Sequence, residues 1–204
     1  MSFAPSLRIA AIVLAAGRSS RMAPRNKLLE SVGGEPMVGR VVSVVLASGA
    51  QPIIVVRGYE ALDVAAALSG LEVTTIVNPD YADGLSTSLR TGLRALPPGI
   101  DGALVCLGDM PDVEPTILRA LMAAFTGADA ICVPVRYGRM GNPVLWGSRY
   151  FAEMMELSGD IGAKPLMAEH RNYLVEVEVA TNSIFADIDV PADLTRAKQR
   201  RANS

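Results

Sequence analysis

A short segment near the start of the chain combines small residues with cations. It reads Leu14-Ala15-Ala16-Gly17-Arg18-Ser19-Ser20-Arg21-Met22 and follows the apolar run Ile9–Leu14, which we expect to be a strand buried on both faces. The small residues let backbone N–H groups approach phosphate oxygens closely. The segment and the residues after it also supply four cations, Arg18, Arg21, Arg25 and Lys27. We therefore predict a site for a ligand with several phosphates, with a turn of solvated arginines as the alternative.

Two aspartate-bearing segments could add a metal site to this loop. Gly108-Asp109-Met110-Pro111 follows an apolar run, and a carboxylate in such a turn can bind Mg²⁺ while water and phosphates supply the remaining ligands. Asp187-Ile188-Asp189-Val190-Pro191 delivers two alternating carboxylates into a helix that starts at a proline. Turn formation and helix capping are the alternative roles. If the fold brings the segments together, Asp187 and Asp189 can complete a metal site with Asp109.

The elements that must position these residues alternate in type. Up to residue 134 the order is strand and helix in repetition, which implies a parallel, doubly wound sheet with right-handed crossovers. In such sheets ligands bind beyond the carboxyl ends of the strands, where both the 14–27 loop and the 108–111 turn fall. The expected strands in this part are 9–14, 53–56, 72–77, 103–107 and 130–134, and the expected helices are 37–47, 61–68, 85–96 and 116–125.

The second half of the chain is less regular. Its predicted elements are a glycine-rich loop at 136–142, strands at 144–146, 173–179 and 183–188, and helices at 149–157, 163–170 and 191–200. The strand at 173–179 alternates like an exposed edge strand. The sequence thus predicts an α/β protein whose doubly wound, mostly parallel sheet precedes an irregular second half. At 204 residues the chain fits one domain, 1–204.

Composition excludes several classes of protein. The net charge is −2, so that a broad basic face for nucleic acid is not expected. His170 is the only histidine and no Cys-x-x-Cys occurs, which excludes a zinc site of the usual ligands. The sequence also has no nucleophile elbow to pair with His170, so that a Ser-His-Asp triad is not expected. Cys106 and Cys132 are expected to be small buried hydrophobic residues. No apolar run reaches the ~18 residues of a membrane span, and we expect a cytoplasmic protein without membrane contact.

In this order and spacing, the three motifs resemble those of the molybdenum cofactor cytidylyltransferase branch of the molybdopterin nucleotidyltransferase-like proteins. The loop is similar to the signature loop of that superfamily, Leu107–Pro111 to its metal-binding turn, and Asp187–Leu194 to its Asp-Ile-Asp-Thr-Pro-Glu-Asp-Leu ending. Further similar segments extend the resemblance over about residues 9–197: Asn78-Pro79, Gly84–Leu89, Arg139–Val144 and Gly159–Lys164. The chain departs from the family at Ala23-Pro24, where glycine is usual, at Lys164 in place of arginine, and at Val190 in place of threonine.

This resemblance implies a Rossmann-like nucleotidyltransferase fold of three α/β/α layers. It also implies transfer of CMP from CTP to the phosphate of the molybdenum–pterin cofactor, with release of pyrophosphate. Arg18, Lys27 and Asp109 are the implied catalytic residues, and Asp109 and Asp189 the implied ligands of Mg²⁺, for which Mn²⁺ can substitute. The implied nucleotide-binding residues are Leu14, Ala15, Ala16, Gly17, Arg18, Ser19, Lys27, Asn78, Gly84, Ser86 and Ser88; the implied acceptor-binding residues are Arg139, Asn142 and Lys164.

The resemblance also bears on the choice of substrate. Ala16 favours CTP over GTP, because Leu-Ala-Ala-Gly accompanies pyrimidine nucleotides in the resembling families and Leu-Ala-Gly-Gly accompanies guanine. Residues 9–110 are the expected nucleotide-binding half, and residues 111–197 the acceptor-binding half. Two alternatives stay open: transfer to a sugar or methylerythritol phosphate, and a non-catalytic role in the maturation of molybdenum enzymes. A molybdenum hydroxylase or its maturation factor is the expected protein partner.

Overall fold

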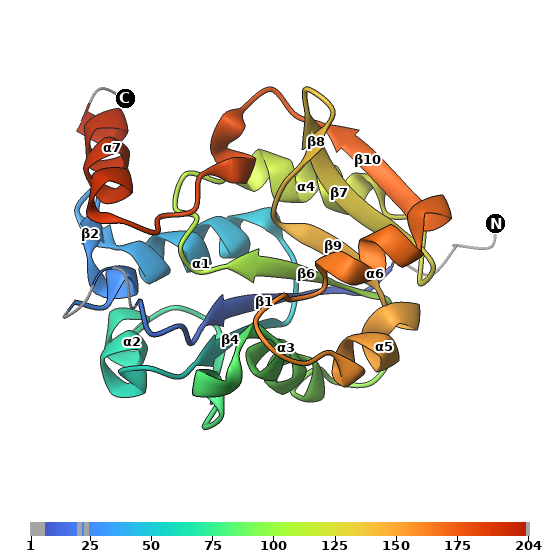
Figure 1. Ribbon diagram of the computed structural model, residues 1–204, viewed down its shortest axis with the longest axis horizontal. Coiled ribbons are helices and arrows are strands. Elements are labelled where there is room, and N and C mark those ends of the chain that lie inside the picture. The colour runs from blue at the N-terminus through green and yellow to red at the C-terminus, as the bar shows by residue number, and fades with distance from the viewer. Residues whose placement is uncertain (1–6, 20–21, 23–24, 203–204) are drawn as a thin grey trace.

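The computed structural model describes residues 7–19, 22 and 25–202. Arg21, one of the four predicted cations, and the Ala23-Pro24 pair lie outside the described residues. Within the described part, eight strands form one sheet: β1 (Ile9–Ala15), β4 (Ile53–Arg57), β5 (Thr74–Val77), β6 (Gly102–Leu107), β7 (Ile131–Arg136), β8 (Arg139–Met140), β9 (Val144–Gly147) and β10 (Leu174–Glu178). Their order is β10-β7-β9-β6-β1-β4-β5, with β8 paired to β7 (Figure 1).

The sheet is mostly parallel, which confirms the expected fold class. β1 pairs in parallel with β4 and β6, and β4 pairs in parallel with β5. β9 is antiparallel to both β6 and β7, and the short β8 is antiparallel to β7. β10 lies at the edge beside β7, as its alternating sequence indicated. Since β9 belongs to the second half of the chain and β6 to the first, both halves share one continuous sheet.

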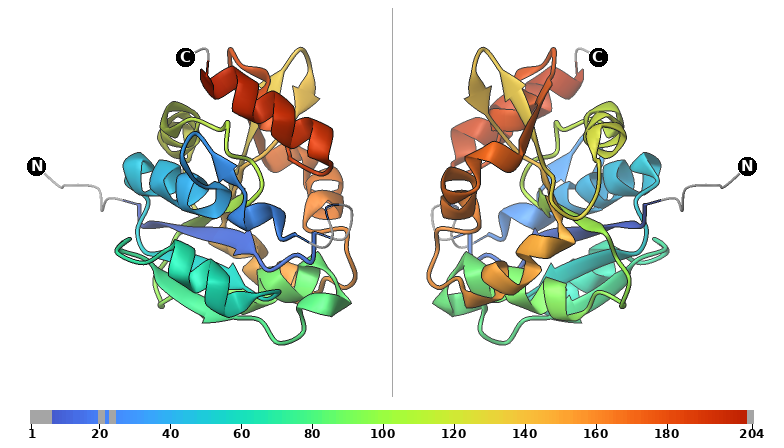
Figure 2. Two further views of the ribbon diagram at one scale, coloured as in Figure 1. Left: turned by 90° about the vertical axis from the view of Figure 1, so that its left-hand side faces the viewer. Right: turned by 90° about the vertical axis from the view of Figure 1, so that its right-hand side faces the viewer.

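Helices cover both faces of this sheet. α1 (Met37–Ser48), α2 (Ala61–Ala67) and α4 (Pro115–Ala124) pack against one face, and α3 (Leu85–Arg94), α5 (Phe151–Glu156) and α6 (Lys164–Glu169) against the other (Figure 2). All of β1 is buried: Ala11 and Val13 belong to the first layer, and Ile12 and Leu14 to the second. A strand that is apolar on both faces must be covered on both faces to keep its side chains from water.

The turn signals of the sequence place most element boundaries within two residues. α1 ends before Gly49, whose φ of 88° is the left-handed conformation that closes many helices. α4 starts at Pro115, a residue whose fixed φ suits the first helical position. No helix in the described ranges combines the length and the apolar character that crossing a bilayer requires.

The predicted strand at 183–188 is wrong. Asn182–Phe185 form a 3₁₀ helix, started by Thr181, whose side chain accepts a hydrogen bond from the Ser183 N–H. The chain then runs, without joining a strand of the described sheet, to α7 (Pro191–Ala202). The Ile188 N–H donates to the Asp109 carbonyl at 3.0 Å. The Ile188 side chain packs in a separate apolar cluster under α7, made of Met22, Val32, Met37, Ile188, Leu194 and Ala197.

A two-stranded hairpin that the sequence analysis did not predict supports α7. β2 (Ser31–Val32) and β3 (Glu35–Pro36) form it, and α7 contacts β2. Such short strands leave too few residues for a recognisable alternation of apolar and polar side chains. The hairpin and α7 together lie at the edge where β1 and β6 end.

Candidate functional site

The predicted loop and the predicted aspartate turn meet at the carboxyl ends of β1 and β6. These strands are parallel neighbours, and Figure 1 shows their arrowheads pointing to the same side of the molecule, the side of α7. The Gly108 N–H donates to the Leu14 carbonyl at 2.9 Å. A Cβ on Gly108 would lie only 3.0 Å from that oxygen, so that glycine permits the close approach. Because the strand order reverses at β1, this edge is where sheets of this kind bind ligands.

Lys27 joins two carboxylates that come from distant parts of the chain. Its Nζ lies 2.7 Å from Asp109 Oδ2 and 3.0 Å from Asp189 Oδ1. The Lys27 side chain is 12% exposed, the Asp109 side chain 21% and the Asp189 side chain 40%. Asn26 starts the 3₁₀ helix Lys27–Leu29 by accepting the Leu28 N–H, which fixes the direction in which Lys27 leaves the loop. The fold thus gathers three predicted site residues from three separate segments.

The cluster carries more negative than positive charge. Burial raises the pKa of Asp109 above its usual value, and the charge of Asp187 adds to the increase, while Lys27 acts in the opposite direction. Burial disfavours the Lys27 ammonium, but Asp109 and Asp189 outweigh burial, so that the pKa of Lys27 lies above its usual value. Among the described residues, Asp109 Oδ1 has no hydrogen-bond partner although it is buried. A further cation would therefore stabilise the ionised carboxylates.

The loop after β1 lies beside this cluster and is only partly exposed. Gly17 and Arg18 are exposed, whereas Ala15 and Ala16 are buried. Ser19 has a φ of 53°, and its Oγ accepts a hydrogen bond from the Lys27 backbone N–H at 3.2 Å, which ties the loop to Lys27. The Arg18 guanidinium carbon lies 5.5 Å from the centre of the Tyr81 ring, a distance at which a cation is attracted to an aromatic face.

Two of the predicted nucleotide-binding residues make internal contacts in this structure. Asn78 is 1% exposed, and its Nδ2 donates to Thr87 Oγ1 at 2.8 Å and to Ser88 Oγ at 3.0 Å. Its Oδ1 accepts the Asp80 N–H at 3.0 Å. These bonds hold the segment between β5 and α3 in place. Asn78 and Ser88 are both buried, so in this structure their contacts are with the protein itself.

Gly84 and Ser86 start α3 and meet a loop from the other half of the chain. Gly84 has a φ of 108°, and a Cβ on it would lie 2.5 Å from the carbonyl oxygen of Gly159. That carbonyl accepts the Ser86 N–H at 3.1 Å, and Asp160 Oδ1 accepts the Leu85 N–H at 3.0 Å. Asp160 thus caps α3 from outside the helix. The Ser86 Oγ is buried and has no hydrogen-bond partner within the described residues.

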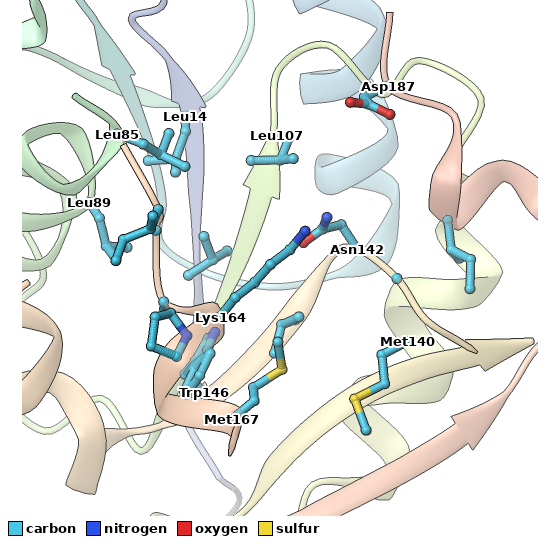
Figure 3. A pocket seen from close by; sticks show the side chains of 18 of the residues that line it. Leu14, Leu85, Leu89, Leu107, Met140, Asn142, Trp146, Lys164, Met167 and Asp187 are labelled. Carbon is cyan, nitrogen blue, oxygen red and sulfur yellow. The ribbon is translucent and has the colours of Figure 1, made fainter. Parts of the chain in front are cut away.

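A large cavity lies between these segments. Its volume is about 1500 Å³, and both halves of the chain line it. The three predicted acceptor-binding residues, Arg139, Asn142 and Lys164, all reach it, and Asp187 lies at its end nearest the Lys27 cluster. Figure 3 shows the Lys164 and Asn142 side chains pointing toward one another inside it. Apolar side chains form much of the remaining wall, among them Leu14, Leu85, Leu89, Leu107, Met140, Trp146 and Met167.

Sequence reasoning missed part of this cavity. The sequence places Asp160 in the family-like segment Gly159–Lys164 without a role in the site, and the nearby glycines Gly159 and Gly162 were the available signal for a closely packed loop. Trp146 and Met167 carried no signal, because they share the cavity only after β9 and α6 have packed.

A doubly wound α/β sheet with a small-residue loop after β1 and an aspartate turn after β6 is the arrangement of a nucleotidyltransferase. Residues 11–173 match the MobA-like NTP transferase domain, and the chain belongs to this family. The family resemblance inferred from the motifs is thereby confirmed. The *Escherichia coli* K12 molybdenum cofactor cytidylyltransferase is 28% identical over 190 residues, which cover 93% of this chain and 95% of the relative.

Other relatives match a smaller part of the chain. The bifunctional protein GlmU of *Agrobacterium fabrum* is 35% identical over 140 residues, which cover 64% of this chain and 31% of GlmU. In three GlmU proteins the matched part covers 31% of the relative's length, so this chain spans only a part of them.

Solved structures of similar proteins share the whole fold. A *Methanothermobacter* nucleotidyl transferase superposes with a TM-score of 0.85 at 30% identity, over 96% of this chain and 98% of that chain. The *Mycobacterium tuberculosis* protein Rv0371c in complex with manganese superposes with a TM-score of 0.80 at 28% identity, over 94% of this chain and 98% of that chain. Both superpositions therefore include the first and the second half of this chain.

Proposed function

We propose that this protein transfers CMP from CTP to the phosphate of the molybdenum–pterin cofactor and releases pyrophosphate. The observation that carries the proposal is the length of the match to the *Escherichia coli* molybdenum cofactor cytidylyltransferase, 93% of this chain. This match extends through the second half, which supplies Arg139, Asn142 and Lys164 to the cavity. Function belongs to such a site rather than to the fold, which many nucleotidyltransferases share.

The proposed reaction joins two anions. An oxygen of the acceptor phosphate attacks the α-phosphorus of CTP in line with the bridging oxygen to the β-phosphate. A phosphorus–oxygen bond to the acceptor forms as the bond to the bridging oxygen breaks, and pyrophosphate leaves with that electron pair. Positioning and neutralisation of charge supply most of the catalysis, and no nucleophilic side chain is needed.

The nucleotide side of the site consists of the loop and its neighbours. Backbone N–H groups of residues 16–19 bind the β- and γ-phosphate oxygens, and Arg18 and Lys27 neutralise the triphosphate and the charge that develops on it. The ribose and base lie beside the segment of Asn78, Gly84, Ser86 and Ser88, in which the buried Ser86 Oγ has no hydrogen-bond partner among the described residues. Ala16 favours cytosine over guanine.

The carboxylates fit a divalent ion. Mg²⁺ is bound through one or two carboxylates and keeps waters and phosphate oxygens as its other ligands. The Asp109 carboxylate is only partly compensated, because Lys27 contacts Oδ2 while the buried Oδ1 lacks a hydrogen-bond partner in the described part of the chain. Asp109 and Asp189 would hold the ion, which when bound supplies positive charge to the phosphates around the reacting phosphorus. The manganese complex of Rv0371c supports Mn²⁺ as a substitute.

The cavity has room for an acceptor beside the nucleotide. Pockets for a single small molecule usually measure ~300–1000 Å³, and this cavity measures about 1500 Å³. Arg139, Asn142 and Lys164 bind the acceptor phosphate and the polar edges of the pterin. Met140 and Met167, which line the cavity without being buried, offer the apolar surface that a flat ring system needs. A molybdenum hydroxylase or its maturation factor receives the product.

Pyrophosphate release tests the proposal. The assay supplies Mg²⁺, CTP or GTP, and in parallel molybdenum-loaded molybdopterin, a sugar phosphate or methylerythritol phosphate, with Asp109→Asn as the inactive control. Release with CTP and the molybdenum cofactor is the expected result. Release with GTP would overturn the role of Ala16, and release with another acceptor would overturn the cofactor assignment. Nucleotide binding without any release would favour the non-catalytic alternative.

A further inference from the structure

Lys27 occupies the oxygens that the proposed metal ion needs. Its Nζ contacts Asp109 Oδ2 at 2.7 Å and Asp189 Oδ1 at 3.0 Å, and both oxygens belong to the carboxylates assigned to Mg²⁺. We propose that Lys27 is the resident counter-ion of Asp109 and Asp189 in the free protein, and that it leaves them when the metal–triphosphate complex enters. The protein then binds the divalent ion with the nucleotide rather than before it. This inference rests on the metal-dependent nucleotidyl transfer proposed above, but not on the identity of the acceptor.

The geometry sets the ammonium and the ion in competition. A Mg²⁺ ion lies about 2.0–2.1 Å from each ligand oxygen, so an ion on these two oxygens would lie against the lysine ammonium that contacts them. Asp109 Oδ1 is buried, so the Asp109 oxygen that lies toward Lys27, Oδ2, is the one that an entering ion reaches first. At such separations two cations repel each other strongly, and more strongly in a partly buried site than in water.

The charges of the cluster make the exchange favourable only when phosphate arrives with the metal. Asp109, Asp187 and Asp189 carry three negative charges when ionised, and Lys27 returns one positive charge. A divalent ion that replaces Lys27 brings two positive charges where the ammonium brought one, so that the ammonium becomes available to another anion. A triphosphate supplies that anion, and the metal bound to it no longer has to displace Lys27 into water.

Lys27 is placed for this movement. Its backbone N–H is bonded to Ser19 Oγ at 3.2 Å, which fixes the start of its side chain beside the phosphate loop. A lysine side chain has four flexible carbon–carbon bonds and a compact ammonium, so rotation of the side chain alone can transfer it from carboxylates to phosphate oxygens. Lys27 therefore binds the carboxylates in the free protein and the triphosphate in the complex.

Mn²⁺ binding to the protein without acceptor tests this exchange. Free Mn²⁺ is titrated by electron paramagnetic resonance against wild type, Lys27→Met and Lys198→Met, which loses a lysine paired with Glu30 at 3.5 Å and serves as the matched control. Without nucleotide, Lys27→Met should bind Mn²⁺ at least about tenfold more tightly than wild type, and Lys198→Met should equal wild type. Equal Mn²⁺ affinities of wild type and Lys27→Met would overturn the exchange.

Nucleotide coupling gives a second measurement, which needs no variant. A non-hydrolysable CTP analogue should raise the Mn²⁺ affinity of wild type, after correction for Mn²⁺ bound by the analogue alone, and by linkage Mn²⁺ should raise the affinity for the analogue equally. An unchanged affinity would count against the exchange even if Lys27→Met fails to fold.

The metal assignment itself is tested separately by Lys27→Met/Asp109→Asn. Loss of the tight Mn²⁺ binding in this double variant would support the role of Asp109. Retention of that binding would place the ion elsewhere and refute the metal part of the proposed function. The two failures are therefore distinguishable.

Discussion

At the scale of single residues, Lys27 holds the site together before any ligand arrives. It contacts two carboxylates that lie 82 and 162 positions away in the chain. With the pKa of the ammonium raised by these neighbours, Lys27 stays charged through the neutral range. A permanent cation at this place can act on the charge that the transferred phosphate and pyrophosphate develop.

Replacing Lys27 by alanine should slow turnover itself. We expect kcat at saturating CTP to fall by about 100-fold or more, because the residue acts on charge that grows toward the transition state. Steady-state kinetics that separate kcat from KM measure this effect. An increase confined to the KM for CTP would make Lys27 a residue of ground-state binding only.

The two cysteines should be chemically inert in the folded protein. Burial raises the pKa of the Cys106 thiol to about 12 and that of the Cys132 thiol to about 11, so that neither forms appreciable thiolate at pH 8. Labelling with a disulfide reagent at pH 8 should detect neither thiol in the native protein and both after denaturation. A rapidly labelled thiol in the native state would show that one of these strands opens readily.

At the scale of elements, the strand ends of the first half could be predicted from the sequence, whereas the path of the segment before α7 could not. Strand ends and turns are local, so that the loop after Leu14 and the turn at Asp109 could be placed on neighbouring strand ends. The segment before α7 has the alternation of a strand, yet Thr181 bonds to the nearby backbone and starts a 3₁₀ helix instead. The hydrogen bond from the Ile188 N–H to the Asp109 carbonyl depends on tertiary packing, which a local sequence pattern does not indicate.

The start of α3 depends on a glycine that the other half of the chain touches. Gly84→Ala should lower the free energy of unfolding by about 2 kcal/mol or more, since Gly84 combines a positive φ with backbone contact. A Cβ would lie 2.5 Å from the Gly159 carbonyl oxygen. Gly127→Ala is the matched control, with a φ of 135° and no atom within 4 Å of its added Cβ. Chemical denaturation measures both; equal losses would mean that φ alone matters at Gly84.

Asp193 holds the start of α7 and, through it, Asp189. Its Oδ2 accepts the Val190 N–H at 3.0 Å and the Asp189 N–H at 3.1 Å, and these backbone bonds lower the pKa of Asp193. Asp193→Ala should cost about 1 kcal/mol of stability and weaken metal binding at Asp189. The stability difference from wild type should be full above the unfolded pKa of 3.8 and fade as the pH falls below it. Thermal unfolding between pH 3 and 7 measures this; a difference that does not change with pH would exclude a role for the ionised carboxylate.

At the scale of the whole molecule, the two halves of the chain share a sheet as well as a site. Trp146 of β9 stands in register with Ala103 of β6 on one side and Ile131 of β7 on the other. β9 thus joins the strands of the first half to those of the second. Separating the halves would expose the fully covered β6–β9 pair, with Trp146, which is only 2% exposed, at its centre.

We therefore expect the chain to unfold as one cooperative unit. Trp146 is the only tryptophan, so its fluorescence reports on the junction, whereas far-ultraviolet circular dichroism reports on helices of both halves. In urea the two signals should change with a single shared midpoint, because opening the junction removes the cover from the core of each half. Added CTP analogue with Mn²⁺ should raise that midpoint for both signals together, since the ligand binds only the assembled site. Two separate midpoints would instead define residues 9–110 and 111–197 as independently stable domains, and would require the cavity between them to form by docking.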